Sequence, residues 1–304
     1  MSPARSSTID WSPAPDWGLA ADLAAISAAP LSPDRGGYTL TMRECAGSEE
    51  VLAALDAERR SGPPGRRLHL GWGSFRNLDI VAARRSDAVV LLDVNLHQLR
   101  VWAAVREALQ LAVDAPAFVD AVLPRLPTQP RLRQFAADTR RWIEGDLQRP
   151  DSWLWPGEPA RFAHVRDRFR AGAVLIGTLD LRARAGTQGR FARLAQALQR
   201  STQADGLQLD TVYISNIPWM LAQPTGFFGE SHREPMDGDE VPVLARVAEN
   251  LSTVLGAARW VISAMQLRAD ATADNLQWQT ELLRPQELLG AARWQALDAP
   301  PPAA

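Results

Sequence analysis

Short apolar runs that alternate with segments of helical periodicity constrain the fold of this 304-residue chain most strongly. This alternation is typical of parallel strands that are covered by helices on both faces. The expected strands are residues 68–71, 88–92, 173–179, 211–215 and 259–265, with a final antiparallel strand at the sheet edge over residues 276–283. The sequence therefore predicts an α/β fold with a Rossmann-like sheet and helices on both faces.

Two regions do not fit a simple repeat of strand and helix. The segment between the second and third expected strands is much longer than an ordinary crossover, so residues 112–170 are expected to form a helical insertion after strand two. Residues 1–60 are interpreted as an N-terminal arm and helical cap, because a Gly- and Pro-containing break follows at residues 61–65. The core is then expected to span residues 61–304.

Glycines at the end of the first expected strand are followed by an acidic residue at the end of the second. Gly71 and Gly73 allow a backbone to approach a nucleotide-like ligand, and Asp93, about twenty residues later, has the spacing of a carboxylate that binds a ribose diol. A third glycine is missing, because Arg76 stands three positions after Gly73. The pattern therefore favours an adenosine cofactor without a pyrophosphate, such as S-adenosylmethionine. An ordinary strand-to-helix turn is the alternative interpretation.

Composition narrows the function further. The net charge of −2 and a pI near 6.1 argue against nucleic-acid binding through the overall field of the protein. All 33 basic residues are arginine, so no lysine is present to form a Schiff base. Cys45 is the single cysteine, and the four histidines are scattered, so no metal site is expected. The lack of a signal pattern and of a membrane-spanning apolar run predicts a cytoplasmic location and no membrane partner.

Four segments together resemble class I S-adenosylmethionine-dependent methyltransferases: residues 68–74, 92–95, 177–180 and 212–219. The resemblance covers residues 66–283 and implies S-adenosyl-L-methionine as the cofactor. By position, it implies that Gly71 and Gly73 cradle the methionine part, that Asp93 binds ribose and that Asp180 meets adenine. The other cofactor-binding residues expected in these segments are Ser74, Asn95 and Ser215.

The loop after the fourth strand resembles two kinds of transferase. Asn216-Ile217-Pro218-Trp219 is similar to the Asn-Pro-Pro-Tyr loop of amino methyltransferases and to its Asn-Leu-Pro-Tyr variant in ribosomal RNA enzymes. Tyr213 with Ser215-Asn216-Ile217 is also similar to the loop of betaine-lipid 3-amino-3-carboxypropyl transferases. Both resemblances imply that Tyr213, Asn216 and Trp219 orient the acceptor as catalytic residues. The plain alternative is that Asn216 caps a helix that Pro218 begins.

These observations predict an S-adenosylmethionine-dependent transferase, of a methyl or a 3-amino-3-carboxypropyl group, that acts on a small-molecule acceptor. An RNA acceptor is disfavoured because the acidic segment 236–240 lies just beyond the strand-four loop. The glycine-containing residues 223–239 are expected to form a lid over the acceptor. Two alternatives stay open: an azetidine-forming cyclisation of S-adenosylmethionine itself, and a non-catalytic module that only binds the cofactor.

Overall fold

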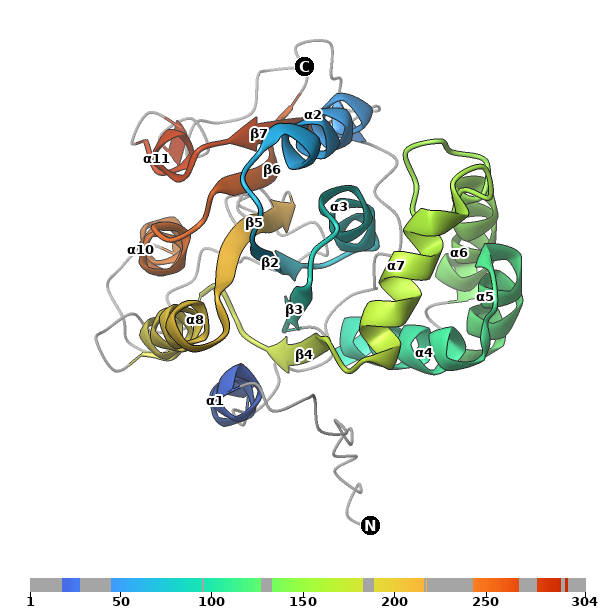
Figure 1. Cartoon of the computed structure of the whole chain (residues 1–304), viewed down its shortest axis with the longest axis horizontal. Coiled ribbons are helices and arrows are strands. Elements are labelled where there is room, and N and C mark those ends of the chain that lie inside the picture. The colour runs from blue at the N-terminus through green and yellow to red at the C-terminus, as the bar shows by residue number, and fades with distance from the viewer. Residues whose placement is uncertain are drawn as a thin grey trace.

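A mostly parallel sheet forms the centre of the protein (Figure 1). The computed structural model describes residues 18–27, 45–94, 96–126, 133–182, 189–215, 217, 243–267, 278–290 and 293–294. The seven strands in these ranges have the order β1-β7-β6-β5-β2-β3-β4. Their bounds are β1 (Cys45–Ala46), β2 (Arg66–Trp72), β3 (Ala88–Asp93), β4 (Val174–Thr178), β5 (Leu207–Ser215), β6 (Trp260–Leu267) and β7 (Trp278–Leu283).

The strands confirm the α/β class that the apolar runs predict. Each of the six expected strands is present, and every neighbouring pair from β6 across to β4 is parallel. β7 is antiparallel to β6, as expected, but it is not the outermost strand because the two-residue β1 pairs with its free side. The order of strands reverses between β2 and β5, which makes this the switch point of a Rossmann-like sheet, where ligands bind at the carboxyl ends of the strands.

Helices cover both faces of the sheet (Figure 1). One face carries α1 (Gly18–Ser27), α8 (Arg190–Asp205), α10 (Val243–Leu255) and α11 (Pro285–Leu288). The other carries α2 (Ser48–Ser61), α3 (Arg76–Arg84), α4 (Leu96–Leu111), α5 (Ala115–Val122) and α7 (Pro159–Arg170). Alternation along β3 supplies both cores, because Val90 and Leu92 face the first set of helices whereas Val89 and Leu91 face the second.

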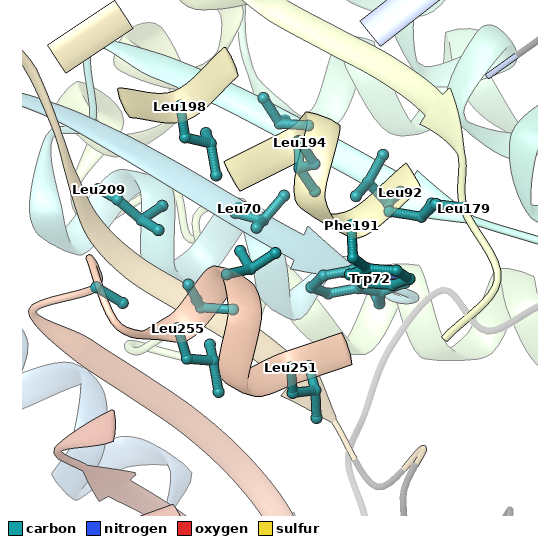
Figure 2. Close-up of a cluster of buried hydrophobic side chains, with 14 of the residues drawn as sticks. Leu70, Trp72, Leu92, Leu179, Phe191, Leu194, Leu198, Leu209, Leu251 and Leu255 are labelled. Atoms are coloured by element: carbon teal, nitrogen blue, oxygen red, sulfur yellow. The ribbon is translucent and has the colours of Figure 1, made fainter. Parts of the chain in front are cut away.

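The core beside α8 and α10 holds the carboxyl end of β2 in place (Figure 2). Leu70 and Trp72 of β2 pack there with Phe191 and Leu194 of α8 and with Leu251 of α10, and each side chain is at most 3% exposed. Burial of one large apolar side chain contributes about 1.5–3 kcal/mol to stability. The strand that precedes the glycine turn is therefore rigidly supported from this side.

The predicted helical insertion is present between β3 and β4. Residues 112–170 contain α5, the short 3₁₀ helix η1 (Leu123–Arg125), α6 (Arg133–Asp146) and α7, and α4 precedes them. Its helices lie together on the α3 side of the sheet (Figure 1) and add no strand among the described residues. Trp153 and Phe162 stack with ring centroids 5.7 Å apart, and Trp153 meets Phe75 at 6.0 Å. This aromatic contact joins the insertion to the start of α3 and shows Trp153 as core.

The described elements of the N-terminal region, α1, β1 and α2, belong to the sheet and to the helical layers that cover it. α1 packs on α8 and β4, where the hydroxyl of Ser27 accepts a hydrogen bond from the backbone N–H of Thr178 at 3.1 Å. A Cβ at Gly177 would lie 2.6 Å from that hydroxyl, so a glycine is needed for α1 to dock. α2 packs on α3, and β1 joins the sheet. The division of the chain at residue 60 stays a prediction.

Candidate functional site

The carboxyl ends of β2, β3 and β5 bring several predicted site residues to one level. In the parallel register Trp72 is opposite Leu92, and Gly71 is opposite Tyr213. Gly73 and Asp93 therefore follow directly at the ends of neighbouring strands, and Ser215 ends β5 on the other side of β2. These residues lie at the switch point, so the sheet topology and the sequence indicate the same position for a ligand, at the carboxyl ends of β2, β3 and β5.

Gly73 has the conformation and the space of a ligand-contacting glycine. Its φ of 85° is one that side-chain-bearing residues rarely adopt, and a Cβ built there would meet nothing within 4 Å. Its carbonyl accepts a hydrogen bond from Nε2 of Gln98 in α4 at 3.0 Å. A ligand can therefore approach the backbone closely at Gly73, while the hydrogen bond from Gln98 holds the turn in place.

Gly71 is a glycine for another reason. A Cβ there would lie 1.6 Å from Oδ1 of Asn77, a fully buried side chain in the first turn of α3. The Asn77 amide nitrogen donates to the carbonyls of Trp72 at 3.2 Å and of Ser74 at 2.8 Å. Gly71 therefore makes room for the side chain that binds the turn, and this packing accounts for it without any ligand.

A buried histidine orients that asparagine. His69 Nε2 lies 2.9 Å from Asn77 Oδ1, and its Nδ1 lies 2.8 Å from Thr211 Oγ1. Because the Asn77 amide nitrogen already donates to two carbonyls, Oδ1 must accept, so we assign the proton to Nε2 and let Nδ1 accept from Thr211. Burial lowers the pKa of His69 to about 4, with partial compensation from the Asn77 hydrogen bond, so the ring is neutral near pH 7.

Arg76, which replaces the third glycine of a dinucleotide turn, anchors the insertion. Its Nη1 donates to Asp79 at 2.9 Å and to Asp151 at 3.1 Å, and it is 4% exposed. Asp79 in turn accepts the backbone N–H of Trp153 at 2.8 Å. Burial raises the pKa of Asp79 against the opposing effect of Arg76. The departure from the glycine pattern therefore has a structural cause, which one sequence alone does not reveal.

Two predicted carboxylates lie at the expected edge. Asp93 ends β3 opposite Thr178 and is partly buried. Asp180 follows β4, and both of its oxygens accept hydrogen bonds from Arg182, with Nε at 3.0 Å from Oδ1 and Nη2 at 2.8 Å from Oδ2. A contact between Asp180 and adenine would therefore use the remaining lone pairs of a paired carboxylate.

The end of β5 is irregular. Ser215 has a φ of 54°, and the register with β6 shifts between Tyr213 and Ser215. A non-glycine residue in this region costs about 1–3 kcal/mol, and such strain is common at functional sites. Tyr213 itself is 1% exposed and packs among Leu55, Ile80 and Ile262 on the α2 and α3 side. It serves as a core residue, and its contact with an acceptor stays a prediction.

The remaining predicted residues divide into two groups. Ser74 is 1% exposed, and its hydroxyl lies 3.4 Å from the backbone nitrogen of Arg76 at the start of α3. Asn95, Asn216, Trp219 and the expected lid over residues 223–239 lie outside the described residues. The described ranges contain no cluster of three or more residues able to hold a metal ion.

A broad groove lies toward the opposite end of the strands, at their amino ends. It runs between α8 and α10 near the amino end of β5, and residues lining it include Gln199, Gln208, Thr253 and Arg259. It contains none of the predicted site residues. Its position at the amino ends of the strands argues against it as the cofactor site, because ligands of open parallel sheets bind at the carboxyl ends.

No protein-family model matches the chain, and no curated protein matches it significantly. Within the described ranges, no helix combines the length and the apolar character needed to cross a bilayer. The functional assignment accordingly depends on the geometry at the switch point.

Proposed function

We propose that the protein is an S-adenosylmethionine-dependent transferase, related to class I methyltransferases, that moves a methyl or a 3-amino-3-carboxypropyl group to a small-molecule acceptor. The observation that carries this proposal is that Gly73 and Asp93 directly follow Trp72 and Leu92, the last paired residues of two neighbouring strands. Gly73 offers open space beside a left-handed backbone, and Asp93 places a carboxylate residue at the carboxyl end of the adjacent strand.

The residues present fit this cofactor better than a dinucleotide. The third-glycine position is Arg76, which is buried in ion pairs with Asp79 and Asp151, so the glycine that allows close packing of the helix in a dinucleotide turn is absent. Bound S-adenosylmethionine would supply a sulfonium whose attached carbons are electrophilic. We propose that Asp93 accepts hydrogen bonds from the ribose hydroxyls and that the Gly73 turn contacts the methionine part.

The work left to the protein is positioning and the exclusion of water. We propose that the insertion contributes to exclusion, since Asp151 and Trp153 are held against the first turn of α3 beside the glycine turn. The acceptor would be oriented from the end of β5, where the strained Ser215 precedes Asn216. The sequence resemblance implies Tyr213, Asn216 and Trp219 for this role.

Product analysis tests the proposal. The purified protein is incubated with S-adenosylmethionine, with and without a panel of small amines and hydroxyl acceptors, and the nucleoside products are quantified. S-Adenosylhomocysteine indicates methyl transfer, and acceptor-dependent methylthioadenosine indicates 3-amino-3-carboxypropyl transfer. Methylthioadenosine without acceptor indicates the azetidine-forming cyclisation. Binding with no turnover under any condition indicates a binding module, and absence of binding rejects the proposal.

A further inference from the structure

We propose that Asn77 is a positioning residue that holds residues 72–74 in the conformation that presents Gly73 to a ligand. The ligand part of this inference rests on the proposed function. Asn77 is fully buried and does not face the open side of Gly73, so it acts through the turn. Its amide nitrogen binds the carbonyls on both sides of Gly73, those of Trp72 and Ser74.

The contacts of Asn77 form a continuous path from the sheet to the turn. Thr211 of β5 contacts His69 of β2 at 2.8 Å, His69 contacts Asn77 at 2.9 Å, and Asn77 binds the turn. Each of these three side chains is 0% exposed. With Gln98 on the carbonyl of Gly73, three successive carbonyl oxygens are engaged by side chains. The backbone of the turn is therefore fixed without any group placed in the open space beside Gly73.

Gly71 and Asn77 are complementary, and this gives the inference a second test. A methyl group at residue 71 would occupy the position of Asn77 Oδ1, with a separation of 1.6 Å. The variant Gly71→Ala alone must displace Asn77, whereas in Gly71→Ala/Asn77→Ala the new methyl groups fill part of the space that the amide vacates. The double variant should therefore fold at least as well as Gly71→Ala but lack the side-chain bonds to the turn, while the backbone N–H of residue 77 still donates to the Ser74 carbonyl.

Thr202, an exposed residue, provides a control for the loss of a side-chain bond to the backbone far from the glycine turn. Its Oγ1 lies within hydrogen-bond distance of two backbone carbonyls, those of Leu198 at 3.1 Å and Leu207 at 2.8 Å. It therefore joins two backbone segments as Asn77 does, but at the amino end of β5, away from the glycine turn. The single hydroxyl proton can serve only these two carbonyls between them, and Thr202→Val removes it with little change of volume.

The experiment uses wild type, Asn77→Ala, Gly71→Ala, Gly71→Ala/Asn77→Ala and Thr202→Val, whose free energies of unfolding are first compared by chemical denaturation. Two further properties are then measured. Amide hydrogen exchange of peptides covering residues 72–77 is measured in the ligand-free protein, and the dissociation constant for S-adenosylmethionine is measured by calorimetry. Both Asn77 variants should exchange faster over residues 72–77 and bind at least about tenfold more weakly, as expected for loss of two buried hydrogen bonds. Thr202→Val should match wild type in both measurements.

Each outcome decides a definite point. A folded Asn77 variant with wild-type exchange over residues 72–77 overturns the inference, and so does a variant with faster exchange but unchanged affinity. Thr202→Val weakening binding as much as Asn77→Ala also overturns it, because the effect would then be general loss of stability. If wild type does not bind S-adenosylmethionine, the proposed function fails, and the exchange data alone decide whether Asn77 holds the turn.

Discussion

At the scale of single residues, glycines in similar sequence positions have different physical causes. Gly73 is required by its φ of 85° and faces open space, whereas Gly71 is required because Asn77 occupies the place of its Cβ. The sequence predicts both as cofactor contacts, since a pattern of glycines carries no information about what fills the neighbouring space. Only Gly73 shows the geometry that close approach by a ligand needs.

The buried His69 makes stability depend on pH. Its folded pKa of about 4 is below the ordinary value of 6.5, so the unfolded chain binds more protons between these values. The contribution of neutral His69 to the free energy of unfolding is therefore fully present above pH 6.5. It is lost as pH falls from 6.5 toward 4, and the loss amounts to about 3 kcal/mol. Urea unfolding across this range should show the loss, and His69→Gln should reduce its slope. An equal slope in the variant would assign the effect to other groups, such as His164, whose pKa is also lowered by burial.

At the scale of elements, the insertion and α3 are linked by charged groups as well as by aromatic packing. Asp79 of α3 accepts from both Arg76 and the backbone of Trp153, and Asp151 accepts from Arg76 and also from Arg149. The side chains of Arg76, Asp79 and Asp151 are each at most 8% exposed. Buried charges need their partners, so this contact is sensitive to the loss of any one member.

Asp79→Ala should lower the free energy of unfolding by about 3–5 kcal/mol, because it leaves Arg76 short of a partner and the N–H of Trp153 unsatisfied. Chemical denaturation measures this, and limited proteolysis should cut sooner within residues 147–158. Glu144→Ala is the control within the insertion, since its ion pair with Arg140 is exposed and contributes little. Similar losses in the two variants would contradict the role assigned to Asp79.

At the scale of the whole molecule, a second charged network joins the layers at the opposite end of the sheet. Arg84 of α3 is 1% exposed and forms two hydrogen bonds with Asp210 of β5, at 2.7 and 2.6 Å. It also donates to the carbonyl of Leu55 and to Glu58 in α2. These ion pairs join α2 and α3 to β5, whereas the turn network lies nearer the carboxyl ends of the strands. Loss of the ion pairs should therefore affect stability more than binding.

Asp210→Ala tests that separation. It should lower the free energy of unfolding by about 3–5 kcal/mol because it leaves the Arg84 guanidinium buried with fewer partners. In protein that remains folded, the affinity for S-adenosylmethionine should stay within about twofold of wild type. Denaturation and calorimetry measure the two quantities on one preparation. A large loss of affinity together with a small loss of stability would show that the two edges are coupled.

The strands and the insertion were predictable because their signals are local. The run from Ala88 to Leu92 is apolar throughout and forms β3, and the length of the segment before β4 requires extra helices. The turn network was not predictable, because His69 and Thr211 are far apart in the sequence and meet only through the register of β2 with β5. The pairing of Arg76 with Asp151 has the same long-range character. The burial of Tyr213 was likewise not predicted, because it depends on the helices α2 and α3 that pack on that face of β5, and its contact with an acceptor stays a prediction.

The central claim is that S-adenosylmethionine binds at the switch point through Asp93. Calorimetric titration of wild type and Asp93→Asn measures this most directly, because the substitution keeps the shape of the side chain and removes its charge. Charge-assisted hydrogen bonds contribute about 1.5–3 kcal/mol, so the folded variant should bind at least about tenfold more weakly. Saturable binding by wild type and this loss in the variant are the predicted result. Equal affinity in the folded variant, or no binding by wild type, would contradict the assignment.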